Sequence, residues 1–365
     1  MKIDLIAGAR PNFIKIASIV SAIEKAHADG KNITYRLIHT GQHYDEKMSG
    51  SFFKQLDIPL PDFNLGAGGG TQAEQTAAIM IGYEKILFEN KPDFCLVVGD
   101  VNSTLACAIT AQKMHVRVVH VEAGIRSGDW SMPEEINRLV TDSITNYFFT
   151  TTENAAELLI KSNVAKENIF FVGNTMIDTL LKFRSRFIKP SIWDEVGLSS
   201  KGYIVITLHR PTNVDSQNNL KSIINEIIEQ SGDLPLIFPV HPRTEKILRQ
   251  IGISNPRLHM VEPLGYLEFN YLVEKSMAVI TDSGGITEET TIMEVPCMTL
   301  RDNTERPETI SIGTNELLGT DPQAIAPAMN KLFSGNWKKG GVPELWDGKT
   351  GERIIKILFD INARN

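Results

Sequence analysis

Residues 3–15, IDLIAGARPNFIK, join a strand, a turn and a helix, and this sequence of elements decides the fold class. Residues 3–7 are apolar enough for a buried strand, Gly8 permits a tight turn, and the proline suits an early helical position. Arg10 and Lys15 then fall near the positive end of that helix, where an anion is stabilised. A surface arginine beside a lysine that covers apolar surface with its stem is the alternative.

Short apolar runs alternate with helix-like segments along the rest of the chain. Such alternation predicts an α/β protein with right-handed crossovers and buried parallel sheets. The pattern loosens over residues 187–202, which hold a proline and two glycines, and we expect a domain boundary near residue 173. Two doubly wound domains are expected, with a ligand in the cleft between strand carboxyl ends. The expected strands are residues 3–7, 35–39, 94–98, 116–121, 147–150 and 169–172, then 203–208, 235–240, 258–261, 278–281 and 297–300.

The composition indicates an ordinary globular protein. Hydrophobic residues make up 42% and charged residues 22% of the 365 residues. The formal net charge of −7 argues against a nucleic-acid or membrane-surface binder, which would carry a basic field. The first apolar run is too short for a signal or spanning segment, and the three cysteines lack metal-ligand spacing. We therefore expect a cytoplasmic enzyme with buried thiols and no metal.

Polar residues gather directly after the expected strands. Asp100 follows one strand and precedes a helix, so it is either a functional carboxylate or a helix cap. Residues 120–138, HVEAGIRSGDWSMPEEINR, crowd four carboxylates, two arginines and a histidine behind another strand. A structural ion-pair network is the alternative for that crowding. The other such segments are residues 40–45, 209–213, 240–243, 282–289 and 301–308.

Residues 282–289, DSGGITEE, predict a phosphate site at a helix N-terminus. The two glycines let backbone N–H groups approach a phosphate, and a later glutamate suits ribose hydroxyls. The segment lacks the GxGxxG spacing of dinucleotide folds and the GKS/T ending of a P-loop. A nucleoside diphosphate is therefore the expected ligand.

Taken together, these motifs resemble the non-hydrolysing UDP-N-acetylglucosamine 2-epimerase family. The resemblance implies two Rossmann-like domains of the glycosyltransferase-B type, residues 1–172 with 352–365 and residues 173–351, with an interdomain cleft. It also implies a homodimer and a reaction without a cofactor. The matching motifs are GARPNFIK, TGQHYD, GDVNST, HVEAGIRS, MPEEINR, LHRPTN, PVHPR, DSGGITEE and RDNTERPE, from residue 8 to residue 308.

The family interconverts UDP-N-acetylglucosamine and UDP-N-acetylmannosamine. Its route expels UDP as the proton on carbon 2 leaves, forms 2-acetamidoglucal, and adds UDP back with a proton on the opposite face. Acid–base carboxylates around the sugar and cations around the diphosphate serve such a route.

Residue by residue, the resemblance implies acid–base roles for Asp100, Glu122 and Glu134, without assigning each to a face of the sugar. His209 joins this catalytic set. The implied substrate and UDP ligands are Arg10, Lys15, Gln42, His43, Arg138, Arg210 and His241, with Phe269 beside uracil, Ser283, Gly284 and Gly285 at the phosphates, Glu289 at the ribose and Arg306 near the sugar.

Four alternatives stay open from the sequence. GARPNF and LHRPTN stand where members acting on UDP-N-acetylglucosamine commonly carry GTRPE and HRREN, which favours relatives that epimerise UDP-2,3-diacetamido-2,3-dideoxyglucuronate. A hydrolysing epimerase, a glycosyltransferase and a non-catalytic UDP-sugar sensor are the others.

Overall fold

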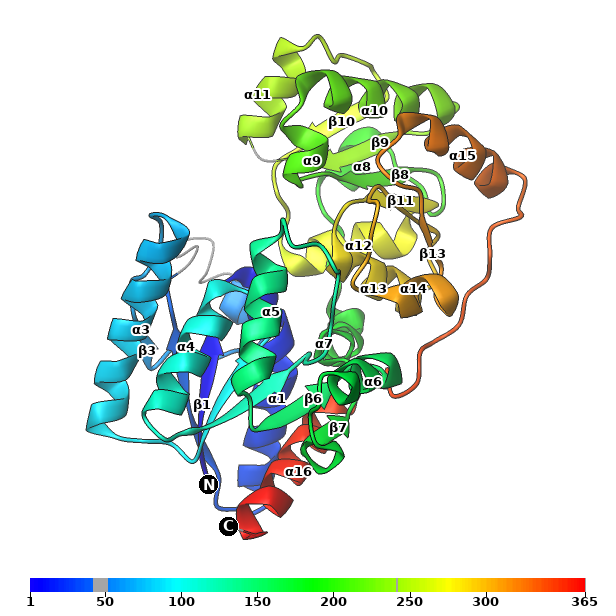
Figure 1. Ribbon diagram of the computed structural model, residues 1–365. Helices are drawn as coiled ribbons and strands as arrows, with labels where there is room; N and C mark the ends of the chain where they lie inside the picture. Colours follow the sequence, from blue (N-terminus) through cyan, green and yellow to red (C-terminus); the bar gives the residue numbers. More distant parts are fainter. Residues whose placement is uncertain (42–51, 241, 365) are drawn as a thin grey trace. The chain divides into compact units, whose positions relative to one another are not determined.

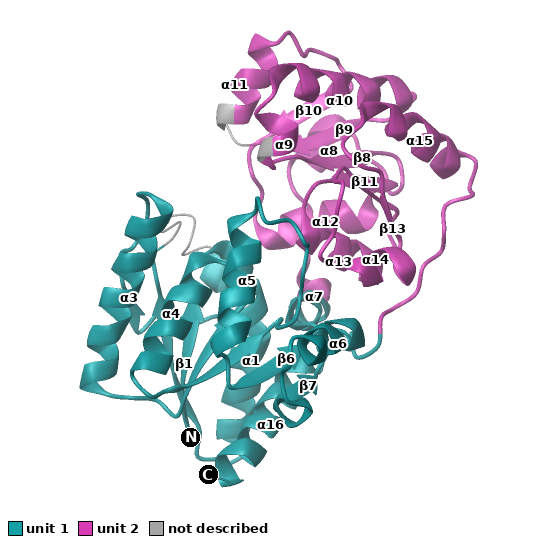
Figure 2. Cartoon of the chain, in the orientation of Figure 1, with its two compact units in different colours: residues 1–182, 344–365 teal, residues 183–343 magenta. Residues whose placement is uncertain are grey.

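The computed structural model describes residues 1–41, 52–240 and 242–364. The chain divides into two compact units, residues 1–182 with 344–365 (unit 1) and residues 183–343 (unit 2), coloured separately in Figure 2. The domain limits expected from the sequence, near residues 173 and 351, and the expected cleft stay predictions. Each unit has its own sheet and hydrophobic core.

Unit 1 is built on a seven-stranded parallel sheet with the order β3-β2-β1-β4-β5-β6-β7. Its central strands are largely apolar, and β4 is a continuous apolar run, FCLVV, as expected where helices cover both faces of a sheet. The order reverses between β1 and β4, which is the topological switch point of a doubly wound sheet. The strands are β1 (Lys2–Ala7), β2 (Thr34–His39), β3 (Phe63–Asn64), β4 (Phe94–Val98), β5 (Arg117–Val121), β6 (Tyr147–Thr150) and β7 (Ile169–Phe171).

The helices of unit 1 form two layers (Figure 1). In one layer α4 (Asn102–Lys113) packs between α3 (Gln72–Glu89) and α5 (Pro133–Ile144). In the other, α1 (Arg10–Ala28) packs against α16 (Thr350–Arg364). Two further helices, α6 (Glu153–Lys161) and α7 (Thr175–Phe183), follow β6 and β7.

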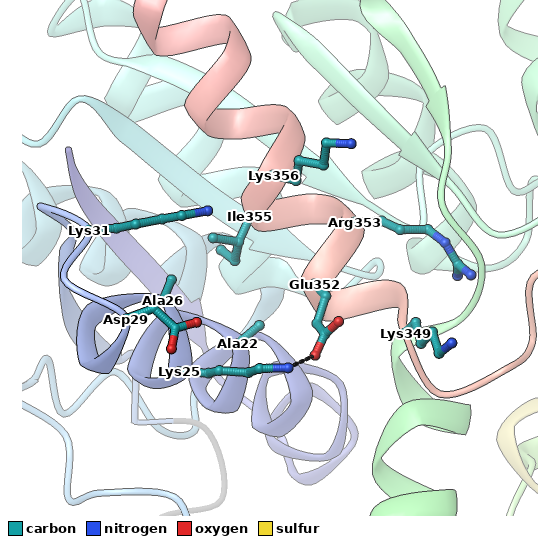
Figure 3. Close-up of a pocket in the computed structure, with 10 residues that line it drawn as sticks. All are labelled: Ala22, Lys25, Ala26, Asp29, Lys31, Lys349, Glu352, Arg353, Ile355 and Lys356. Atoms are coloured by element: carbon teal, nitrogen blue, oxygen red, sulfur yellow. Dashed lines mark hydrogen bonds and ion pairs between the residues drawn. The ribbon is translucent and has the colours of Figure 1, made fainter.

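The C-terminal segment completes the core of unit 1. Four side chains of α16, Ile354, Ile355, Leu358 and Ile361, are buried. The helices approach so closely that a side chain at Gly351 would begin 2.6 Å from the carbonyl oxygen of Ser18. Across a shallow pocket at this contact, Lys25 of α1 pairs with Glu352 of α16 at 2.5 Å (Figure 3). Before α16, the indole of Trp346 is buried and donates to the carbonyl of Thr151.

Unit 2 contains a six-stranded parallel sheet with the order β10-β9-β8-β11-β12-β13, which reverses between β8 and β11. Its strands are β8 (Ile204–Thr207), β9 (Leu236–Pro239), β10 (Leu258–Val261), β11 (Ala278–Thr281), β12 (Cys297–Thr299) and β13 (Asn315–Leu317). Its helices are α8 (Ile192–Val196), α9 (Pro211–Val214), α10 (Gln217–Gln230), α11 (Pro242–Gln250), α12 (Tyr266–Lys275), α13 (Gly284–Met293), α14 (Pro307–Ser311) and α15 (Ile325–Phe333).

The predicted α/β class with two parallel sheets is confirmed, and every expected strand is present with small changes at its ends. Among the strands of the described residues, only β3 and β13 lack a predicted counterpart. Both are edge strands of two or three residues, so neither has an apolar run long enough to predict a strand. The three cysteines are buried and free, as expected. No helix in the described ranges combines the length and the apolar character that a membrane crossing requires.

Candidate active site

The predicted site residues of unit 1 lie at the carboxyl ends of β1, β4 and β5. Arg10 follows β1 and begins α1, Asp100 follows β4, and Glu122 follows β5. Parallel strands that are neighbours in the sheet end at one edge, so the topology brings these residues together. Arg10 is half-buried, forms no ion pair with another described residue, and stays available to an anion.

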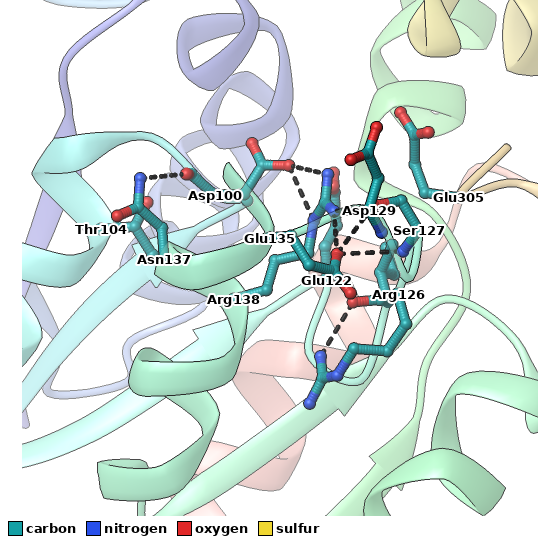
Figure 4. Close-up of polar contacts among 12 residues, drawn as sticks. Asp100, Thr104, Glu122, Arg126, Ser127, Asp129, Glu135, Asn137, Arg138 and Glu305 are labelled. Carbon is teal, nitrogen blue, oxygen red and sulfur yellow. Dashed lines mark hydrogen bonds and ion pairs between the residues drawn. The ribbon is translucent and has the colours of Figure 1, made fainter. Parts of the chain in front are cut away.

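Asp100 is bound by an arginine and does not cap a helix. Arg138 of α5 donates from Nε at 3.0 Å and from Nη2 at 2.6 Å to the same carboxylate oxygen (Figure 4). No side chain caps α4, so the helix-cap alternative for Asp100 is wrong. Arg138 Nη1 also lies 2.5 Å from Glu135. A buried guanidinium therefore holds two carboxylates in place.

Glu135 is held as an anion by its surroundings. Its carboxylate accepts the backbone N–H groups of Ser127 and Gly128, at 2.9 and 3.0 Å. Burial raises the pKa of Glu135, but these two N–H groups and Arg138 outweigh burial and lower the pKa below its ordinary value. Glu135 thus fixes the loop before α5 as well as Arg138.

Glu122 forms a buried ion pair in a strained backbone conformation. Lys15 Nζ lies 2.8 Å from Glu122 Oε2, and both side chains are less than one-tenth exposed. Glu122 has φ of 69°, a left-handed conformation that is rare for residues other than glycine and is associated with functional sites. Gly99 packs against this pair, since a side chain there would begin 2.8 Å from Lys15 Nζ. The expected place of Lys15 at the diphosphate stays a prediction.

Behind Glu122, a buried histidine joins two strand ends. His120 Nδ1 lies 2.7 Å from Asp142 of α5, and Nε2 lies 2.8 Å from the carbonyl oxygen of Gly99. Asp142 also pairs with Arg126 at 2.7 Å. His120 thus links the end of β5 to the end of β4, and Asp142 links His120 to Arg126.

Asp142 gives the fold a measurable acid dependence. Burial raises its pKa, but His120 and Arg126 outweigh burial and lower the pKa below the ordinary value of 3.8. A carboxyl with a depressed folded-state pKa stabilises the fold above its unfolded pKa, and this stability is lost as the pH falls through the folded pKa. When the pH falls from 7 to below about 4, the unfolding free energy of both proteins should fall. We expect the fall to be about 1–2 kcal/mol smaller for the Asp142→Asn variant than for the unmodified protein.

Urea unfolding between pH 7 and pH 3 measures this difference. Asp360→Asn, at an exposed position of α16, is the matched control and should follow the unmodified protein. Parallel pH profiles for Asp142→Asn and the unmodified protein would contradict the depressed pKa.

Glu134 lies in the first turn of α5 and is half-buried. The turn places it one residue from Glu135, so the two side chains point in different directions from the helix. Its expected acid–base role stays a prediction.

In unit 2, Asp282 organises the loop that follows β8. Its buried carboxylate accepts the backbone N–H groups of His209 and Arg210 and the side-chain amide of Asn213. Burial raises the pKa of Asp282, but the hydrogen bond from His209 and these other donors lower it below its ordinary value. His209 Nδ1 lies 2.8 Å from Asp282 while the ring is 64% exposed. Nε2 of His209 is thereby presented to a ligand.

The N-terminus of α13 has the features expected of a phosphate site. Ser283 is the N-cap residue, no side chain caps the helix, and its first turn holds no acidic residue. The N–H groups of Gly284 and Gly285 lie in this first turn. The positive end of the helix therefore has no capping side chain and no acidic residue of its own first turn, which suits an anion.

The other predicted ligands of unit 2 lie on α12, on α13 and at the start of α14. Glu289 is buried and accepts a hydrogen bond from the hydroxyl of Tyr266 at 2.9 Å. Burial raises the pKa of Glu289 to about 7. Phe269 lies half-buried on α12, one turn from Tyr266. Arg306 pairs with Glu288 at 2.9 Å.

Some predicted residues cannot be placed. Gln42, His43 and His241 lie outside the described residues. Within the described ranges, no group of three or more His, Cys, Asp and Glu side chains is arranged to hold a metal ion.

Four supporting residues were not among the predicted site residues: His120, Asp142, Arg301 and Glu305. Asp142 lies in the last turn of α5, and its partners become visible only when β5 and α5 pack together. Residues 301–308 are unremarkable if they form a surface turn, but Arg301 is buried, with its side chain only 4% exposed. The burial of Arg301 marks the segment as part of the site, and the sequence alone does not reveal that this arginine is buried.

A family model described as UDP-N-acetylglucosamine 2-epimerase matches residues 25–359. The UDP-N-acetylglucosamine 2-epimerase of Methanocaldococcus jannaschii is 42% identical, over 98% of this chain and 99% of that protein. The UDP-2,3-diacetamido-2,3-dideoxy-D-glucuronate 2-epimerase of Pseudomonas aeruginosa is 41% identical, over 98% of this chain and 99% of that protein.

Solved structures show the same likeness. The crystal structure of the M. jannaschii UDP-GlcNAc 2-epimerase in complex with UDP-GlcNAc and UDP has a TM-score of 0.89 and 42% identity, and the match covers 99% of this chain and 100% of that one. The lipopolysaccharide outer core galactosyltransferase WaaB has a TM-score of 0.57 at 14% identity over 99% of both chains. This second likeness concerns the fold alone, which is of the glycosyltransferase-B type.

Proposed function

The chain belongs to the UDP-N-acetylglucosamine 2-epimerase family and is a UDP-sugar 2-epimerase, and we propose that it interconverts UDP-N-acetylglucosamine and UDP-N-acetylmannosamine. The observation that carries this proposal is the pair of cation-bound carboxylates, Asp100 and Glu122, at neighbouring strand ends of unit 1. Their positions match the motifs of the family.

The proposed reaction is an anti elimination followed by re-addition. A carboxylate removes the proton from carbon 2, the bond from carbon 1 to the diphosphate oxygen breaks, and UDP leaves with the electron pair. The product, 2-acetamidoglucal, then receives UDP at carbon 1 and a proton on the opposite face of carbon 2. No net oxidation occurs, so the scheme needs no redox cofactor.

We assign the acid–base steps to Asp100, Glu122 and Glu134 of unit 1. Two faces of carbon 2 exchange a proton, so at least two groups are needed. Two N–H groups of Arg138 donate to Asp100, and the left-handed backbone of Glu122 limits the directions that its side chain can take. Both carboxylates are therefore positioned, as general acid–base catalysis requires. Arg138 then acts through Asp100.

We assign UDP binding chiefly to unit 2. The uncapped N-terminus of α13, with Ser283, Gly284 and Gly285, suits the phosphates. His209 and Arg210 follow β8, which pairs with β11, the strand before α13. They add hydrogen-bond donors, which suits a leaving group that gains negative charge. Glu289 is assigned to the ribose, Phe269 to uracil and Arg306 to the sugar. Arg10 and Lys15 of unit 1 complete the proposed set.

Incubation with UDP-N-acetylglucosamine in deuterated water tests the proposal. We expect deuterium at carbon 2 in both epimers, because the proton that returns comes from an exchanged carboxyl group. Steady accumulation of free UDP and sugar would point instead to a hydrolysing epimerase.

A second substrate has a specific observation in its favour. The P. aeruginosa relative named for UDP-2,3-diacetamido-2,3-dideoxy-D-glucuronate is 41% identical, against 42% for the M. jannaschii enzyme. The same exchange assay with this sugar decides between them, since the better substrate has the higher kcat/KM.

The three free, buried cysteines support our proposal of a cytoplasmic, reducing location.

We also propose a homodimer formed through the layer of α3, α4 and α5. Ile81 and Phe88 of α3 are 57% and 71% exposed, and they share one helix face because they are seven residues apart. Ile136 and Val140 of α5 are also exposed. Exposed apolar residues on two helices that flank α4 are typical of an interaction surface.

Phe88→Glu is expected to shift the dimer toward monomer by at least about tenfold in dissociation constant, since a large apolar side chain becomes a buried charge at the interface. Sedimentation velocity at several protein concentrations measures the change. Phe333→Glu, at an exposed phenylalanine of α15, is the control and should leave the dimer intact. If Phe88→Glu stays dimeric, this layer is not the interface.

A further inference from the structure

A glutamate of this chain lies beside the N-terminus of α13, which no side chain caps. A side chain at Gly284 would begin only 2.7 Å from Glu305 Oε1, so this carboxylate lies directly beside the first residue of the helix. Glu305 is nearly buried, and it reaches this place from the segment that follows β12. The positive helix end therefore faces an anion supplied by the protein itself.

Two arginines share the same carboxylate. Arg301 Nη2 lies 2.6 Å from Glu305 Oε2, and Arg210 Nη2 lies 3.7 Å from Glu305 Oε1. Arg301 Nη1 is buried without a hydrogen-bond acceptor and lies 3.7 Å from where a side chain at Gly284 would begin. One carboxylate thus lies against two guanidinium groups and the first residue of α13. Arg301 retains one N–H donor without an acceptor. This excess of positive charge is the pattern of an anion site.

We propose that Glu305 is an internal anion that competes with the phosphate groups of UDP for Arg301, Arg210 and the N-terminus of α13. The inference rests on the proposed function, because it takes UDP as the competing ligand. Two anions cannot share this site at low cost, so binding of the diphosphate displaces Glu305 or works against its charge. Arg301 is then a phosphate-binding residue as well as the partner of Glu305.

The competition sets the affinity for UDP below the value that the cations alone would give. An enzyme that expels UDP, takes it back and then releases a UDP-sugar gains no rate from very tight binding of the ground state. Glu305 also keeps Arg301 and Arg210 oriented before the ligand arrives, which reduces the ordering required on binding.

Isothermal titration calorimetry with UDP tests the proposal on the full chain. Glu305→Gln keeps the size of the side chain and one acceptor for Arg301 but removes the charge. We expect this variant to bind UDP at least about tenfold more tightly. Glu229→Gln, at an exposed position of α10, makes the same change of charge elsewhere and should leave the affinity unchanged. A gain of affinity cannot come from partial unfolding, so the expected result excludes a purely structural effect.

Two further measurements locate the effect. Uridine, which has no phosphate, should bind the Glu305→Gln variant and the unmodified protein equally, as followed by ligand NMR. Arg301→Met should weaken UDP binding by about tenfold or more, because it removes a buried cation from the phosphates.

The outcomes separate this inference from the function on which it rests. If the unmodified protein binds UDP and Glu305→Gln binds it equally or more weakly, the internal-anion role is wrong and the proposed function stands. Equal tightening for uridine and UDP would also overturn it, since the phosphate charge would then be irrelevant. If the unmodified protein binds no UDP, both fail.

Discussion

Glu122→Gln is expected to lower kcat by about 10²- to 10⁴-fold, the usual contribution of a positioned general acid or base. The amide cannot accept or return the proton of carbon 2. The change is nearly isosteric, and UDP binding by unit 2 should be retained because its proposed ligands are elsewhere in the chain. NMR in deuterated water measures both epimerisation and deuterium uptake at carbon 2.

The matched control for Glu122→Gln is Glu167→Gln, an exposed glutamate of the same unit that should retain full activity. Removing the charge of Glu122 also leaves the buried Lys15 without its partner, so the thermal unfolding of each variant must be compared. A folded Glu122→Gln protein with full kcat would exclude Glu122 from the chemistry. The initial rate of deuterium uptake at carbon 2 is measured separately from each epimer, for Glu122→Gln, Asp100→Asn and Glu134→Gln. Comparison of the two rates for each variant assigns each carboxylate to a face.

Arg138→Met is expected to reduce the unfolding free energy by about 3–5 kcal/mol and to abolish most activity. The buried Glu135 loses the cation at 2.5 Å, and Asp100 loses the two N–H donors of Arg138. Loss of these contacts should also raise the pKa of Glu135. Burial raises this pKa, and without Arg138 only the hydrogen bonds from Ser127 and Gly128 are left to lower it. Urea unfolding at pH 7 gives the stability, and the exchange assay gives the activity.

An exposed ion pair in unit 2 provides the comparison. Arg249 and Glu245 lie 2.7 Å apart on the surface of α11, and Arg249→Met should change the unfolding free energy by less than about 0.5 kcal/mol. Combining Arg138→Met with Glu135→Gln should restore part of the lost stability, since the unpaired buried charge is gone. If Arg138→Met costs no more than Arg249→Met, the buried network does not hold the site.

The two sheets were predictable because each central strand is a short apolar run bounded by turn residues and helices. β4, for example, is FCLVV between a proline–aspartate turn and a glycine at φ of 68°. Periodicity says nothing about a strand such as β3, whose two residues join the sheet only because β2 offers a free edge. Length therefore set the limit of the fold prediction.

The candidate site was predictable as a set of positions but not as a set of contacts. Asp100 and Glu122 stand out because charges directly after apolar strands are unusual. That Arg138 would bind Asp100, and Lys15 would bind Glu122, depends on the packing of α5 and α1 against the strand ends. Sequence spacing does not encode that packing. For the same reason, Glu305 was visible as one charge of a polar segment but not as the occupant of a helix end.

The place of α16 has a consequence for how the protein is made. The buried face of α16 and the indole of Trp346 belong to the core of unit 1, yet they are synthesised after all of unit 2. During translation, unit 2 can complete its core first, while α1 still exposes the apolar face that α16 will cover. A nascent chain that ends at residue 343, followed by a linker long enough to fill the ribosomal exit tunnel, should therefore display a folded unit 2 and a protease-sensitive unit 1.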